Sequence, residues 1–117
     1  MGSALHKPAP VCLLTTTGRK TGKSHTTPLL YLQRGTEIVV VASQGGRAHN
    51  PAWYLNLQAT PTVTIDVGRR RGSYLAHTAS DTEREELWPA LVDMYADFAT
   101  YDSWTERTIP IVVCVPA

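Results

Sequence analysis

Val11-Cys-Leu-Leu-Thr-Thr-Thr17 and the loop after it, Gly18-Arg-Lys-Thr-Gly-Lys23, carry the clearest structural signal in the chain. The first seven residues are mostly apolar or β-branched, which favours a strand, and Gly18 ends it. A second extended run, His25 to Gln33, follows the loop. Pro28 lies within this run, and because proline has no N–H to donate, it predicts an edge strand or a bulge.

Four further runs favour strands. Arg34-Gly35-Thr36 turns the chain from the second run into a buried strand, so these two are expected to form a hairpin. A second hairpin is expected around the turn Gly68-Arg-Arg-Arg-Gly72. The four runs are Glu37 to Ser43, Thr62 to Val67, Ser73 to Thr78 and Ile111 to Val115.

Helix signals stand at two places. Asn50 is expected to be an N-cap and Pro51 the first residue of a helix that ends at about Gln58, because proline's missing N–H has no partner there. Ser80-Asp-Thr-Glu83 fits a capping box and begins another helix, which Pro89 is expected to kink or interrupt. About six mainly antiparallel strands with two or three helices predict an α+β barrel or sheet.

Composition limits the class of protein. With 117 residues, of which 43% are hydrophobic and 18% charged, the chain can bury one core and is too apolar for disorder. We expect residues 11–117 to form a single domain and residues 1–10 to be an N-terminal tail or a remnant of expression. No apolar run approaches the roughly 20 residues that span a bilayer. A cytoplasmic location is therefore expected, with both cysteines reduced and buried.

The net charge of +1 hides an uneven distribution. Residues 1–72 carry nine Lys or Arg and two Asp or Glu, whereas the remainder carries two and eight. This split predicts an anion-binding surface in the first part of the chain. The near-neutral total argues against a nucleic-acid partner. The four histidines have no spacing that would gather metal ligands, so no metal site is expected.

Two loops are candidates for binding an anion. The first, residues 15–23, places three cations and two glycines between strands, where backbone N–H groups and charge-assisted hydrogen bonds can meet phosphate or carboxylate oxygens. The second, residues 43–51, leads through Gly45 and Gly46 to a helix N-terminus, which also favours an anion. Each loop also admits a simpler interpretation: a solvated basic turn for the first and an ordinary strand-to-helix connection for the second.

The chain shows no self-sufficient catalytic machinery. Ser43, for example, lacks the Gly-x-Ser-x-Gly elbow of serine nucleophiles. This absence favours a protein that holds a cofactor whose own chemistry does the work. Aromatic residues are dense in the acidic segment near the C-terminus, where Tyr101 and Trp104 could line a cavity for a flat ligand. The aromatic residues of this segment are Trp88, Tyr95, Phe98, Tyr101 and Trp104.

Five motifs occur in order along nearly everything after residue 10. They are Leu14-Thr-Thr-Thr-Gly-Arg-Lys-Thr-Gly22, Thr27-Pro28-Leu29, Val41-Ala-Ser-Gln-Gly-Gly46, Asn50-Pro-Ala-Trp-Tyr-Leu-Asn56 and Arg107-Thr-Ile-Pro110. Together they resemble the deazaflavin-dependent nitroreductase family. The resemblance implies a split β-barrel that binds coenzyme F420, a deazaflavin with a phosphate and an oligoglutamate tail. It also implies hydride transfer from reduced F420 to a quinone, an enone or a nitroaromatic.

The resemblance also implies roles for individual residues. The basic loop would hold the anionic tail, and residues 43–46 would lie against the deazaflavin ring or its phosphate. Tyr101 would border the substrate pocket and orient the acceptor or donate a proton, with Ser43 as a second catalytic candidate. Phe98 stands where relatives often carry tyrosine. The expected cofactor-binding residues are Arg19, Lys20, Thr21, Lys23, Thr27, Pro28, Ser43, Gln44, Gly45, Gly46, Arg47, Asn50 and Trp53.

Other functions stay open at this point. The same site could bind F420 or a fatty acid without turnover, or the protein could be an FMN-binding flavoprotein. The expected partner is a small-molecule substrate, membrane contact is expected to be peripheral at most, and both a monomer and a homodimer are compatible with the sequence.

Overall fold

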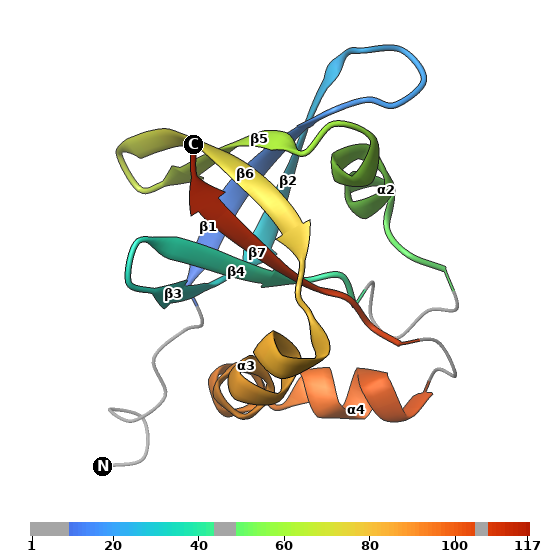
Figure 1. Cartoon of the computed structure of the whole chain (residues 1–117), viewed down its shortest axis with the longest axis vertical. Coiled ribbons are helices and arrows are strands. Elements are labelled where there is room, and N and C mark those ends of the chain that lie inside the picture. Colours follow the sequence, from blue (N-terminus) through green and yellow to red (C-terminus); the bar gives the residue numbers. More distant parts are fainter. Residues whose placement is uncertain (1–9, 44–48, 105–107) are drawn as a thin grey trace.

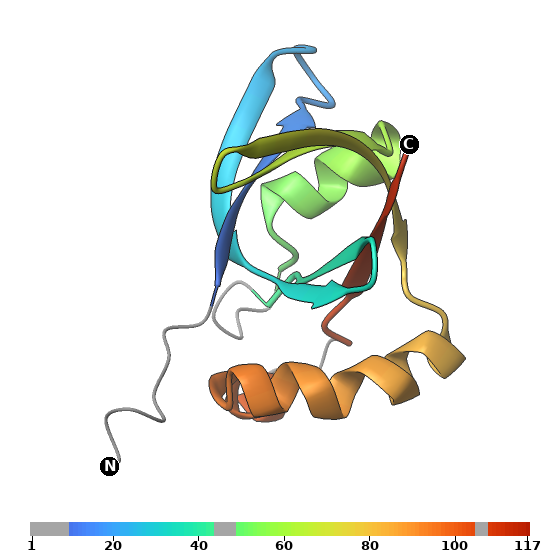
Figure 2. The same ribbon diagram turned by 90° about the vertical axis from the view of Figure 1, so that its left-hand side faces the viewer.

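The computed structural model describes residues 10–43, 49–104 and 108–117. Within them, seven strands form one antiparallel sheet in the order β2-β1-β5-β6-β7-β4-β3, with three helices around it (Figure 1). The sheet curls into most of a ring, which Figure 2 shows end on. This confirms the expected α+β split barrel. The strands are β1 (Val11–Thr17), β2 (Ser24–Leu30), β3 (Leu32–Arg34), β4 (Glu37–Val41), β5 (Thr62–Val67), β6 (Arg70–Thr78) and β7 (Ile111–Pro116).

The prediction of one strand from His25 to Gln33 is wrong, and this is why seven strands are seen where six were expected. The run divides at Tyr31 into β2, which pairs with β1, and β3, which pairs with β4. Because β2 and β3 lie at opposite ends of the sheet order, one straight strand could not reach both partners. The N–H of Tyr31 instead donates to the carbonyl of Pro10 at 3.1 Å. Pro28 lies in β2, which is an edge strand as predicted.

The β5–β6 hairpin is tighter than predicted. Its turn consists of two residues, Gly68 and Arg69, and β6 begins at Arg70 instead of Ser73. Asp66 and Arg71 face each other across the two strands, and the carboxylate accepts from Nε at 2.7 Å and from Nη2 at 3.2 Å. This cross-strand pair extends the ladder through residues whose charge suggested a loop.

Strands β4 and β7 lie between two hydrophobic cores. Alternate residues point into the barrel, where Ile38, Val40 and Cys114 pack. The residues between them point outward into a second core against the C-terminal helices, where Val39 and Val113 pack. Burial on both faces explains why these two strands read as continuous apolar runs without alternation.

Helix α2 (Ala52–Ala59) covers one end of the barrel (Figures 1 and 2). Its N-cap is Pro51, so the prediction that Asn50 caps the helix is wrong by one residue. Pro51 has extended backbone angles, and its carbonyl already accepts from the N–H of Tyr54 at 3.1 Å, as an N-cap carbonyl does. The side chains that α2 adds to the barrel core are Trp53, Tyr54 and Leu57.

Helix α3 (Asp81–Met94) begins at the predicted capping box, which is confirmed. Ser80 Oγ accepts from the Glu83 N–H at 3.2 Å, and Glu83 Oε1 accepts from the Ser80 N–H at 3.0 Å. The expected interruption at Pro89 does not occur, because α3 continues through it. Pro89 removes the donor for the carbonyl of Glu85, and both residues are exposed, so water can satisfy that carbonyl.

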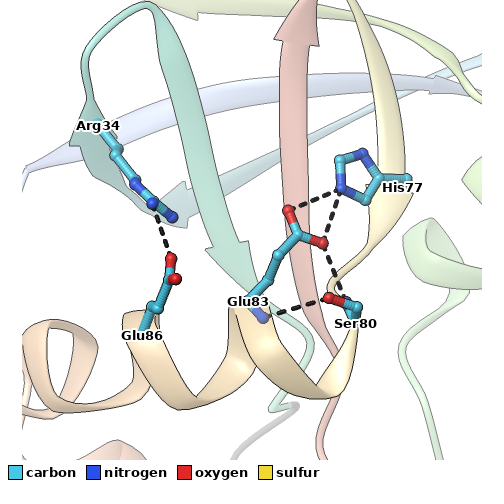
Figure 3. Close-up of polar contacts among 5 residues, drawn as sticks. All are labelled: Arg34, His77, Ser80, Glu83 and Glu86. Carbon is cyan, nitrogen blue, oxygen red and sulfur yellow. Dashed lines mark hydrogen bonds and ion pairs between the residues drawn. The ribbon is translucent and has the colours of Figure 1, made fainter.

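An ion pair and a histidine–carboxylate hydrogen bond connect α3 to the sheet (Figure 3). Arg34 Nη2 of β3 lies 2.9 Å from Glu86 Oε2, and His77 Nε2 of β6 lies 3.2 Å from both Glu83 oxygens.

Helix α4 (Asp97–Trp104) follows α3 after a short break and packs Phe98 into the second core. The C-terminal helices are thereby held below β4 and β7 as drawn in Figure 1.

Candidate functional site

The basic loop between β1 and β2 is closed by its own backbone. The N–H of Gly18 donates to the carbonyl of Lys23 at 2.7 Å, and the N–H of Gly22 donates to the carbonyl of Gly18 at 2.8 Å. Gly22 has a φ of +73°, a conformation that favours glycine. A Cβ at Gly18 would lie 2.8 Å from His25 Nε2, so a larger residue there would require the His25 side chain to shift.

A cavity of about 600 Å³ lies between this loop, β2 and the start of α2. Its lining combines cations, hydroxyl groups, the His25 imidazole and the Trp53 indole. Lys23 belongs to the same loop but does not line the cavity, and neither Lys20 nor Lys23 has an acidic partner within the residues that the structure describes. The predicted cofactor-binding residues that line it are Arg19, Lys20, Thr21, Thr27 and Trp53.

Asn56 of α2 joins the basic loop to the barrel. It is buried, with 4% of its surface exposed. Its Oδ1 accepts from the backbone N–H of Arg19 at 3.2 Å and from Arg19 Nη1 at 2.9 Å, and its Nδ2 donates to Thr16 Oγ1 at 3.2 Å. Asn56 also lines the 600 Å³ cavity, as does His25. Sequence reasoning assigned neither residue to the site.

A second cavity of about 230 Å³ lies where β2, the end of β4 and the C-terminal helices meet. It brings together Ser43 and Tyr101, the two predicted catalytic residues, with Pro28 beside them. Among the described residues, the rest of its lining is apolar except for the hydroxyl of Tyr95. The described residues that line it are Pro28, Leu29, Leu30, Val41, Ser43, Tyr95, Phe98 and Tyr101.

Tyr95 and Tyr101 form a hydroxyl pair in this cavity. Their oxygen atoms are 3.2 Å apart, and the Tyr95 ring packs edge-on against Phe98 with centroids 5.0 Å apart. The hydrogen bond to Tyr101, with a further contribution from Asp97, raises the pKa of Tyr95 well above its usual value. Tyr95 therefore stays protonated at neutral pH. Sequence reasoning placed Tyr95 in an aromatic cluster but not beside the hydroxyl of Tyr101.

The two cavities adjoin the same edge strand. Thr27 lines the cationic cavity and its neighbour Pro28 lines the aromatic one. Ser43, the first residue of the second predicted loop, lines the aromatic cavity, and Ala52, which follows that loop, lines the cationic one. Asn50 is partly buried and lies just before the N-cap of α2, outside both linings. The remaining predicted residues, Gln44, Gly45, Gly46 and Arg47, lie outside the described residues.

The two cysteines line neither of these cavities. Burial raises the pKa of the Cys12 thiol to about 11 and that of Cys114 to about 12, so both are neutral, as expected of buried thiols. Within residues 10–43, 49–104 and 108–117, no three His, Cys, Asp or Glu side chains are grouped to hold a metal ion. No helix in this part of the chain is long and apolar enough to cross a membrane.

A third cavity, of about 490 Å³, opens between the β3–β4 and β5–β6 turns. Its floor is apolar and includes Ile38 and Ile65, and its rim includes Arg70 and Arg71. Arg71 is already paired with Asp66. None of the predicted site residues that the structure describes lines this cavity.

Comparison with known proteins identifies the family to which the chain belongs. A sequence profile described as F420H(2)-dependent quinone reductase matches residues 1–116. A Mycobacterium tuberculosis protein, Rv3178, provisionally named an F420H(2)-dependent quinone reductase, is 45% identical over 99% of this chain and 98% of its own length.

Two solved structures share the fold closely. One is described as an F420-H2 dependent reductase and has a TM-score of 0.83 at 36% identity, covering 90% of this chain and 93% of its own. The other, described as a domain-swapped dimer, has a TM-score of 0.85 at 34% identity, covering 97% and 87%. The chain therefore belongs to the F420H(2)-dependent quinone reductase family and is a reductase that uses coenzyme F420.

Proposed function

We propose that the protein transfers a hydride from reduced F420 to a small electron-poor acceptor, a quinone first and also an enone or a nitroaromatic, in the 230 Å³ cavity. The coarser part of this statement, an F420-dependent reductase, follows from the family. The acceptor and the residue roles are the proposal. When bound, reduced F420 supplies the hydride.

The residues that line the 600 Å³ cavity fit the cofactor's anionic tail. Arg19 and Lys20 offer charge-assisted donors, and Thr21 and Thr27 offer hydroxyl groups, the types of side chain that bind phosphate and carboxylate oxygens. Trp53 contributes an aromatic ring at the wall. The two backbone hydrogen bonds at Gly18 close the loop that lines this cavity.

The aromatic cavity fits a flat acceptor. Leu29, Val41 and Phe98 provide an apolar lining against which the ring of an acceptor can pack. The Tyr101 hydroxyl is placed to orient an acceptor oxygen and to give it a proton, which solvent then replaces. A quinone that receives one hydride and one proton becomes a hydroquinone, so two electrons and two protons are accounted for. Ser43 adds a hydroxyl at the end of β4 that can hold the same or a second acceptor oxygen.

The observation that supports this function most strongly is the position of the two cavities. A cationic cavity and an apolar cavity with tyrosine hydroxyls lie on adjacent residues of one edge strand, Thr27 and Pro28. A cofactor that is anionic at one end and aromatic at the other requires such a pair of sites. An acceptor also needs a dry position beside the aromatic end.

The test is oxidation of reduced F420 by the purified protein with menadione as acceptor. The function predicts a rate that is proportional to protein concentration and that NADPH cannot sustain in place of reduced F420. Enones and nitroaromatics are then compared with menadione under the same conditions. Binding of F420 without turnover of any acceptor would favour a carrier protein instead, and a yellow preparation that holds FMN would favour a flavoprotein.

A further inference from the structure

The geometry points to Asn56 as a positioning residue for the cofactor tail: it holds the basic loop in its binding conformation from within the barrel. This inference rests on the proposed function, because it concerns the same cationic cavity. Asn56 need not touch the cofactor to act. It would act through Arg19, whose backbone and side chain it holds together.

Three hydrogen bonds connect the core to the loop through one side chain. The amide of Asn56 donates to Thr16 Oγ1, and Thr16 is itself 2% exposed on the inward face of β1. The amide oxygen accepts two bonds from Arg19, 37 residues away in the chain, at 3.2 and 2.9 Å. The loop is thus anchored to α2 and β1 at a point beyond its own hairpin hydrogen bonds.

This arrangement changes the expected role of Arg19. One guanidinium nitrogen is committed to Asn56, but the planar group carries five N–H donors, so others remain for an anion. The hydrogen bond fixes the direction in which they point. Neither Lys20 nor Lys23 has an ion-pair partner in the described part of the chain. Arg19 is then held in its binding orientation before the cofactor binds, and the two hydrogen bonds to Asn56 hold it there.

Pre-organisation matters because a flexible cationic loop loses conformational entropy when it closes on a ligand. An anchored loop has already lost part of that entropy in the free protein. The effect of Asn56 should therefore appear in affinity for the tail and not in affinity for the deazaflavin ring. This distinction separates a positioning role from a general contribution to folding.

The experiment measures the affinities of two probes, F420 with its full tail and the deazaflavin chromophore that lacks the phosphate and glutamates. Wild-type protein should bind F420 more tightly than the truncated probe. Asn56→Ala should weaken F420 binding about 5- to 30-fold, as expected for one or two hydrogen bonds of ordinary net strength, and leave truncated-probe binding unchanged. Gln58→Ala is the matched control, because Gln58 lies on the same helix and bonds only to Tyr54 at 3.3 Å among the described residues.

A second variant covers the case in which Asn56→Ala does not fold. Thr16→Val removes only the hydroxyl that holds the Asn56 amide and should lower the F420 affinity in the same tail-dependent way, by a smaller factor. Equal loss for both probes, or no loss for either, would overturn the inference. If wild-type protein bound both probes equally, the loop would not hold the tail, whereas failure to bind F420 at all would refute the proposed function itself.

Discussion

Replacing Tyr101 by phenylalanine tests whether the Tyr101 hydroxyl takes part in the reaction or only makes a structural hydrogen bond. The variant keeps the ring and removes the oxygen that lies 3.2 Å from the Tyr95 hydroxyl. A part-buried neutral hydrogen bond is worth about 1 kcal/mol net, which lowers Tm by roughly 3–6 °C in a domain of this size. That loss is expected whether or not Tyr101 takes part in the reaction.

The kinetic effect is where the two interpretations differ. If the Tyr101 hydroxyl protonates the acceptor, kcat with menadione should fall on the order of 10²-fold or more, with the F420 dissociation constant unchanged. The assay follows the absorbance of reduced F420 in steady state, and Tm is measured on the same preparations. Because the cationic cavity does not include Tyr101, cofactor affinity is an internal control.

Two further variants serve as controls for Tyr101→Phe. Tyr95→Phe removes the same hydrogen bond from its other partner but keeps the Tyr101 hydroxyl, so it should lose the same few degrees of Tm and less than about tenfold in kcat. Tyr74→Phe, in the cavity at the other end of the barrel, should change neither. Full turnover by Tyr101→Phe, or equal kinetic losses in the Tyr95 and Tyr101 variants, would refute the assignment.

Three other predictions follow from charge and burial. Alanine at both Lys20 and Lys23 should weaken F420 binding, each lost charge-assisted bond costing about 1.5–3 kcal/mol, and added salt should weaken wild-type binding too; an affinity unchanged by both would show that the loop is a solvated turn. The hydrogen bond from the Ser80 N–H and then the contact with His77 lower the pKa of Glu83 in the folded protein. The ionised Glu83 therefore stabilises the fold at pH values above 4.5, the ordinary pKa of the group, and this stabilisation is lost as pH falls through the lower pKa of the folded state. Acid titration of Tm should thus be steeper for wild type than for Glu83→Gln, and parallel curves would contradict this. Cys12 and Cys114 should resist a thiol reagent at pH 8 until the protein unfolds, because burial raises both pKa values; rapid labelling of folded protein would count against the buried positions.

The sequence predicts the elements whose signals are local. The capping box at Ser80 and Glu83 is satisfied within one helical turn, so four residues suffice to identify it. The continuous apolar runs of β4 and β7 likewise report burial on both faces. The basic loop is visible because its glycines and cations are adjacent in the chain.

The errors occur where a distant partner decides the outcome. The break at Tyr31 depends on the curl of the whole sheet, and the early start of β6 depends on Asp66 across the hairpin from Arg71. Neither the curl nor that pairing can be read from a local pattern.

The missed site residues have the same cause. Asn56 is a polar residue within an apolar helical stretch, which is a signal for a buried contact, but its partner Arg19 is 37 residues away. Tyr95 and Tyr101 are six residues apart, a spacing that does not place two side chains on one face of a continuous helix. Their hydroxyls meet because α3 ends at Met94 and α4 begins at Asp97.

The most direct test of the central claim is a binding titration of the purified protein with F420 and, in parallel, with FMN. The account predicts saturable binding of F420 that weakens as salt is added, because Arg19 and Lys20 contact the anionic tail and Lys23 adds charge on the same loop, and no comparable binding of FMN. Preferential binding of FMN, or F420 affinity that does not depend on salt or on the presence of the tail, would contradict it.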